Sequence, residues 1–77
     1  MAFRHDAAVT QSTLAHHLAP FGLELDDPLR ACDEAVCSGR RVFVLHLDAP
    51  FPRSAFRCTV QRFADGSHGV TQVERVR

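Results

Sequence analysis

Length, composition and charge describe one small domain with an uneven distribution of charge. The chain has 77 residues, 45% of them hydrophobic. It has neither the ~18-residue apolar run of a membrane span nor the apolar segment of a secretory signal. We therefore expect a single cytoplasmic domain over residues 1–77. Residues 1–39 hold six acidic residues and two arginines, whereas residues 40–77 hold seven arginines and three acidic residues, so local charges of −4 and +4 cancel to a net charge of zero.

The first predicted element is a helix over about residues 10–18. Its start is open, because either Asp6 or Thr10 can serve as the N-cap. Pro20 and Gly22 mark its end. The side chains expected on its apolar face are Leu14, Ala15 and Leu18.

A second helix is predicted over about residues 28–38. Asp27 is the expected N-cap, Pro28 fits the first helical position, and Gly39 can adopt the left-handed conformation after the last turn. The spacing of Leu29, Cys32 and Val36 predicts one apolar stripe along this helix.

Strand patterns follow from residue 41 onward. Residues 42–45 are apolar on both faces, which predicts a central or doubly covered strand. Residues 55–63 alternate, so that one face carries Phe56, Cys58 and Val60 and the other carries Arg57, Thr59 and Gln61. The last segment, residues 70–76, is rich in valine and threonine and is expected to be a strand.

Asp65-Gly66 predicts a tight two-residue hairpin turn between the last two strands. This turn sets a register that pairs Cys58 with Val73, Val60 with Thr71, Arg57 with Glu74 and Thr59 with Gln72. The expected fold is therefore α+β, with two helices on one face of a three-stranded antiparallel meander in the order ααβββ.

The spacing of the cysteines and histidines argues against a metal, a cofactor or an active site. Cys32 and Cys37 are five apart on a helix and face different directions, and the odd cysteine count predicts reduced thiols. Cys58 and His46 on neighbouring strands are the nearest approach to a nucleophile–base pair. No glycine pattern predicts a phosphate loop, and we expect a binding protein without catalytic activity.

The candidate partner-binding residues are six arginines and one phenylalanine. Arginines on and beside the outer sheet face can engage phosphates or an acidic protein surface, or can simply be solvated. Phe51 lies between two prolines beside an arginine, which is typical of an interface hot spot, although it could instead fold back onto the core. The set comprises Arg40, Arg41, Phe51, Arg53, Arg57, Arg62 and Arg75.

The chain is small, its charge is polarised, and it lacks lysine, isoleucine, asparagine and tyrosine, residues with A/T-rich codons, which indicates a GC-rich genome. In these respects the whole chain resembles the small phage-encoded anti-CRISPR proteins, a group with no shared motif. The resemblance implies a protein that binds a CRISPR effector complex and blocks target DNA. The acidic segment could then mimic DNA phosphates, or the arginine face could bind an acidic patch.

Two other partners remain open. The arginine-rich face could bind nucleic acid. Base stacking would require several exposed aromatic side chains among the basic residues, however, and Phe63 is the only one expected there. A homodimer could pair the negative half of one chain with the positive half of another.

Overall fold

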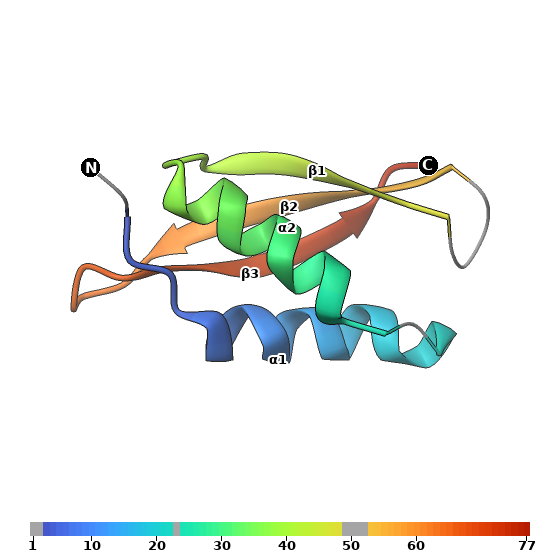
Figure 1. Ribbon diagram of the computed structural model, residues 1–77, viewed down its shortest axis with the longest axis horizontal. Helices are drawn as coiled ribbons and strands as arrows, with labels where there is room; N and C mark the ends of the chain where they lie inside the picture. Colours follow the sequence, from blue (N-terminus) through green and yellow to red (C-terminus); the bar gives the residue numbers. More distant parts are fainter. Residues whose placement is uncertain (1–2, 23, 49–52) are drawn as a thin grey trace.

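The computed structural model describes residues 3–22, 24–48 and 53–77 and has the predicted α+β layout. Helices α1 and α2 pack on an antiparallel sheet with the strand order β1-β2-β3 (Figure 1). The elements are α1 (Ala7–Leu18), the short 3-10 helix η1 (Ala19–Phe21), α2 (Asp26–Cys37), β1 (Val42–Leu47), β2 (Ser54–Arg62) and β3 (His68–Arg75).

Both helices begin earlier than predicted. Asp6 caps α1, because its Oδ1 accepts a hydrogen bond from the Val9 backbone N–H at 3.2 Å, which decides between the two candidate caps. Helix α2 begins at Asp26 without a side-chain cap, so the prediction of Asp27 as the cap was wrong. Pro28 is tolerated there because a residue of the first turn needs no N–H. Within the described residues, neither helix is long and apolar enough to cross a membrane.

The core lies between the two helices and the inner face of the sheet. Leu14 and Leu18 of α1 meet Cys32 and Val36 of α2, as the apolar stripes predicted. The sheet contributes side chains from all three strands, namely Phe43, Leu45, Phe56, Cys58, Val70 and Val73. Burial of these side chains is the main force that holds the helices on the sheet.

Strand β1 is an edge strand and not the central strand that its composition predicted. Phe43 and Leu45 are buried against the helices, whereas Val42 and Val44 on the opposite face are 54% and 43% exposed. His46 shares this outer face and is exposed, and not half-buried as expected for a strand covered on both sides.

The β2–β3 hairpin has a longer loop than predicted, and a bulge compensates for it. Phe63 N–H donates to Ser67 O at 2.8 Å, so the loop holds three residues and not two. The register then shifts between Thr59 and Val60, where Val60 pairs with Val70 and not with Thr71. The bulge restores the predicted pairing beyond it, and the confirmed pairs are Cys58–Val73, Arg57–Glu74 and Thr59–Gln72.

Candidate functional site

Three of the predicted arginines meet at one end of the molecule. Arg40, Arg41 and Arg62 line a hollow of about 540 Å³ together with Phe3 and His68. The hollow lies where the N-terminal segment, the end of α2 and the β2–β3 hairpin come together (Figure 1). We call this set of five residues the arginine hollow.

Arg40 and Arg41 reach the hollow because α2 ends just before them. Gly39 takes the left-handed conformation, with φ +84°, and turns the chain as predicted. Backbone donors already serve the carbonyls at this helix end: Gly39 N–H bonds Val36 O at 3.0 Å, and Arg40 N–H bonds Ala35 O at 3.1 Å. The two guanidinium groups are therefore not needed to cap the helix.

Arg62 and His68 are cross-strand neighbours at the end of the β2–β3 hairpin. The N-terminal segment fixes His68, because its N–H donates to Arg4 O at 2.9 Å and its carbonyl accepts from Asp6 N–H at 2.8 Å. The Phe3 ring meets the His68 ring edge-on, with 5.1 Å between centroids. Nδ1 of His68 is buried and has no hydrogen-bond partner among the described residues.

The carboxylate of this hairpin is already engaged by other groups. Asp65 accepts hydrogen bonds from Ser67 N–H at 3.0 Å and from its hydroxyl at 2.6 Å, and it pairs with Arg4 at 3.0 Å. The Ser67 hydrogen bonds, aided by the charge of Arg4, hold the pKa of Asp65 below its ordinary value. Within the described ranges no ion pair involves the three arginines of the arginine hollow, so their charge is uncompensated there.

The other predicted partner-binding residues lie elsewhere. Arg57, on the outer sheet face, donates to Glu74 Oε2 at 2.8 Å. Arg75 donates through Nε to Arg77 O at the opposite end of the sheet. Arg53 precedes β2 with φ +61°. Phe51 lies outside the described residues.

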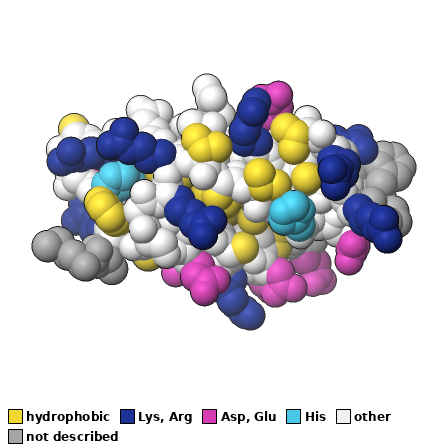
Figure 2. Space-filling view, turned by 90° about the horizontal axis from the view of Figure 1, so that it is seen from above, with side chains coloured by type: hydrophobic (Ala, Val, Ile, Leu, Met, Phe, Trp, Pro, Cys, Tyr) yellow, Lys and Arg dark blue, Asp and Glu magenta, His cyan; other side chains and the backbone are white. Residues whose placement is uncertain are grey.

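The distribution of charge is visible on the surface. Figure 2 shows arginine side chains gathered at both ends of one face, and most of the acidic side chains in view lie along one long side. The acidic first turn of α2, Asp26 and Asp27, has an internal explanation, because negative charge stabilises the N-terminus of a helix.

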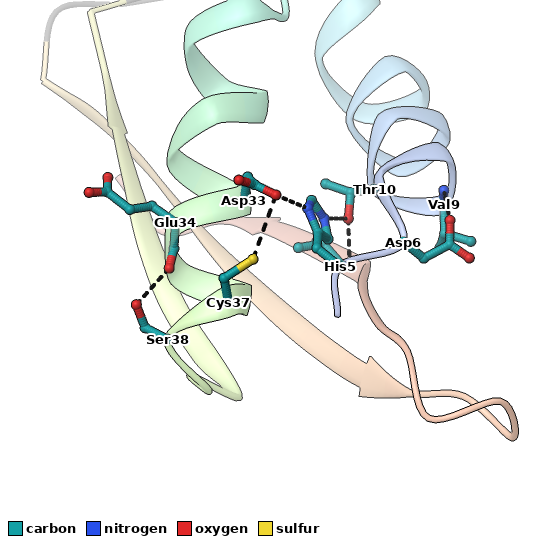
Figure 3. A network of polar contacts seen from close by, with 9 residues as sticks. His5, Asp6, Val9, Thr10, Asp33, Glu34, Cys37 and Ser38 are labelled. Carbon is teal, nitrogen blue, oxygen red and sulfur yellow. Dashed lines mark hydrogen bonds and ion pairs between the residues drawn. The ribbon is translucent and has the colours of Figure 1, made fainter. Parts of the chain in front are cut away.

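A polar network, buried at His5 and Thr10 but exposed at Asp33, joins the N-terminal segment to both helices (Figure 3). His5 Nδ1 lies 2.8 Å from Asp33 Oδ1 of α2, and His5 Nε2 lies 2.7 Å from Thr10 Oγ1 of α1. Thr10 Oγ1 also accepts a hydrogen bond from the Val70 N–H of β3 at 3.0 Å. Nothing in the spacing of residues 5, 10 and 33 pointed to this network.

The order of carboxylate, imidazole and hydroxyl in this network is that of a nucleophilic triad. Burial argues against that role: the His5 side chain is 3% exposed and Thr10 is fully buried. A substrate cannot reach the hydroxyl, so the network acts as a structural link between the N-terminal segment, α1, α2 and β3.

The three thiols differ in environment. Cys32 and Cys58 are buried in the core, and Cys37 is half-exposed. Cys58 faces the helices while His46 faces outward, so the nucleophile–base pair considered from sequence does not form. A hydrogen bond with Cys32 and burial raise the pKa of Cys58, which keeps this thiol protonated.

Comparison with known proteins adds no relationship to this geometry. No protein-family model, curated protein or solved structure matches the chain. Within the part of the chain that the structure describes, no group of three or more metal-ligating side chains is placed to hold a metal ion. Among the described residues, the arginine hollow is therefore the strongest candidate site.

Proposed function

We propose that this chain is a small, non-enzymatic, cytoplasmic binding protein that inhibits or modulates a larger macromolecular complex by occupying an anionic surface on it. The observation that carries this proposal is the arginine hollow, where Arg40, Arg41 and Arg62 converge with no ion-pair partner among the described residues. Guanidinium groups bind carboxylates and phosphates in a bidentate geometry, and such pairs are strong when they are partly desolvated.

The simpler explanation of these arginines is that they are solvated and only keep one end of the molecule soluble. Two features favour a binding role. The Phe3 ring beside them is 46% exposed, and exposed aromatic and arginine side chains together are typical of interface hot spots. The acidic side, in contrast, is partly used within the molecule, because Asp33 is bound to His5.

The resemblance to anti-CRISPR proteins gives the proposal a specific first target. The channel that holds the RNA–DNA heteroduplex of a CRISPR effector complex is positively charged, so the arginine hollow would bind an acidic patch elsewhere on the complex and block target DNA from there. Binding to such a complex, followed by loss of its DNA binding, is the outcome that this version of the proposal requires.

Nucleic acid is the second candidate partner. Phe63, the aromatic residue that the sequence suggested for base stacking, is half-buried. Phe3 takes its place, because it is exposed and lies within the arginine hollow. An aromatic ring beside arginines is the arrangement with which proteins bind single strands.

A capture experiment separates the two candidates. Tagged wild-type protein is incubated with lysate of a GC-rich bacterium carrying a CRISPR system, with and without nuclease, alongside the double variant Arg41→Ala, Arg62→Ala. The matched control is Arg30→Ala, which removes an exposed arginine from α2. We expect a defined protein complex that resists nuclease, persists with the control and is lost with the double variant.

Capture that disappears with nuclease would indicate that the arginine hollow binds nucleic acid and not a protein surface. Equal capture by the wild type and the double variant would refute a role for the arginine hollow in either case.

A further inference from the structure

Strand β1 combines the composition of an interior strand with the position of an edge strand. It lies at one end of the strand order. Its outer-face valines, Val42 and Val44, are exposed. Within Val42–Leu47 there is no lysine, arginine, aspartate, glutamate or proline, although such residues normally protect an edge from pairing with another chain.

The free edge of β1 offers backbone groups in a regular pattern. Val60 N–H donates to Arg41 O at 2.8 Å, and hydrogen bonding alternates along an antiparallel pair. The groups of Phe43 and Leu45 therefore point toward β2. The N–H and C=O groups of Val42, Val44 and His46 point away from the sheet, toward solvent.

The opposite edge of the sheet is protected. The N-terminal segment bonds to His68 of β3 on both its N–H and its C=O. Further along β3, the exposed charged residues Glu74 and Arg75 follow one another. The contrast between the two edges indicates that β1 is the one built for a partner strand.

We propose that β1 pairs with β1 of a second copy of this chain, antiparallel and with the two-fold axis at Val44, so that one continuous sheet runs through both copies. In this register Val44 lies opposite Val44 of the second copy, and Val42 lies opposite His46. Each outward-facing residue then exchanges both of its backbone hydrogen bonds. The exposed valine side chains then lie beside side chains of the neighbouring strand on the outer face, and these cross-strand contacts remove part of their apolar surface from water.

Charge complementarity selects this register. An axis at Val44 brings Arg40, which precedes β1, toward Asp48 of the other copy, which follows β1, at both ends of the paired strands. An axis at Phe43 would instead place Arg40 opposite His46 and Asp48 opposite Ser38, with no opposite charges paired. Cross-strand pairs of opposite charge stabilise a sheet and set its register.

The surface beside the edge also allows a second copy to approach. An open groove of about 400 Å³ runs between α2 and β1, and its lining includes Ala31, Ala35, Glu34 and Arg40. The two-fold axis brings the same groove of both copies to one side of the joined sheet. Small alanines there permit close approach, and Glu34 and Arg40 are mutually complementary in charge.

Light scattering coupled to size-exclusion chromatography tests this pairing independently of the proposed function. We expect the wild type to approach twice its monomer mass of 8.6 kDa at high protein concentration. Val44→Asp and Val44→Lys each place like charges opposite one another across the axis, so each variant alone should remain at the monomer mass. An equal mixture of the two should restore the dimer, because Asp then faces Lys.

Gln72→Asp is the matched control. It adds a charge on the same outer face, but on β3 and therefore away from the proposed pairing edge of β1. A wild type that stays monomeric at all concentrations, or a dimer that survives Val44→Asp, would overturn the proposal. Equal disruption by Gln72→Asp would do the same.

Amide hydrogen exchange of the wild type supplies a second measurement that does not depend on any variant folding. The amides of Val42, Val44 and His46 should gain protection as the protein concentration rises, whereas the exposed edge of a monomer gains none. Protection that is independent of concentration would refute pairing through β1.

Discussion

At the residue scale, the most consequential side chain is one that the sequence did not single out. His5 connects Asp33 of α2 to Thr10 of α1, and Thr10 accepts from Val70 of β3. An imidazole that donates through Nδ1 to Asp33 and accepts through Nε2 a hydrogen bond from the Thr10 hydroxyl gives every group in this chain of contacts a partner. Leaving such groups unpaired in a buried site is more costly than the hydrogen bonds are favourable.

Replacing His5 therefore tests the structural role of the network. His5→Ala leaves the Thr10 hydroxyl without its imidazole partner in a buried site, and we expect the free energy of unfolding to fall by about 1–3 kcal/mol. Urea denaturation followed by circular dichroism measures the change. His16→Ala, at an exposed position of α1, should change it by less than about 0.5 kcal/mol; a His5→Ala variant as stable as this control would contradict the assignment.

The thiols give a second prediction at this scale. Cys37 is the half-exposed thiol, and partial desolvation together with the negative charge and hydrogen bond of Asp33 raises its pKa. Because the thiolate is the reactive form, we expect Cys37 to be alkylated slowly in the native protein at neutral pH, and Cys32 and Cys58 to react only after unfolding. Mass spectrometry of iodoacetamide-treated protein distinguishes the three, and rapid native labelling of Cys58 would show that the core is more open than described.

At the element scale, the β2–β3 hairpin has the predicted register from Thr59 toward the start of β2, although its loop is longer than predicted. The predicted two-residue turn omitted one residue from the loop, and the bulge at Thr71 adds one to β3, so the two differences cancel beyond Thr59. The longer loop is stabilised locally, since Asp65 binds Ser67 and Gly66 adopts a φ of +86°. The predicted helices were correct in number and face. Helix α1 begins directly after Asp6, the earlier of its two candidate caps. Helix α2 begins before its predicted start because its first turn forms without a capping side chain.

Substitutions at two glycines with positive φ distinguish an effect on stability from an effect on partner binding. Gly39 and Gly66 have φ +84° and +86°, so Gly→Ala at either position should cost about 1 kcal/mol of stability. A Cβ at Gly39 would also lie 2.6 Å from the Phe3 ring, whereas a Cβ at Gly66 meets nothing within 4 Å. We expect Gly39→Ala alone to displace Phe3 and weaken partner capture.

Denaturation curves and the capture experiment, run on both variants, measure these two effects. Equal loss of capture by Gly39→Ala and Gly66→Ala would show that Phe3 contributes nothing specific to binding.

At the scale of the whole molecule, the separation of charge along the sequence becomes a separation in space only in part. Arginine side chains gather at both ends of the face in Figure 2 but also lie between them, and most of the acidic side chains in view lie along one long side. Since the two signs are not simply opposed across the molecule, the dimer expected from half-to-half attraction is less well supported than pairing through the edge of β1.

Salt dependence tests how the arginine hollow engages a nucleic-acid partner. Three arginines that each neutralise one phosphate of a single strand should give a slope of about −2 in a plot of log affinity against log salt concentration. Arg41→Ala should reduce the magnitude of that slope by about 0.7. Fluorescence anisotropy with a labelled oligonucleotide measures both, and an affinity without salt dependence would exclude phosphate contacts as its source.

The sequence by itself determined the two helices, the three strands, the apolar faces of both helices and of β2, and the partners of Arg57 and Cys58. These features depend on periodicity and on turn residues, which act over a few positions along the chain. Tertiary structure alone decided that the outer face of β1 stays exposed, that Arg40 and Arg41 meet Arg62 at one end, and that His5 joins Asp33 to Thr10. Such contacts join residues far apart in the sequence, and they exist only once the helices have packed on the sheet and buried the core between them.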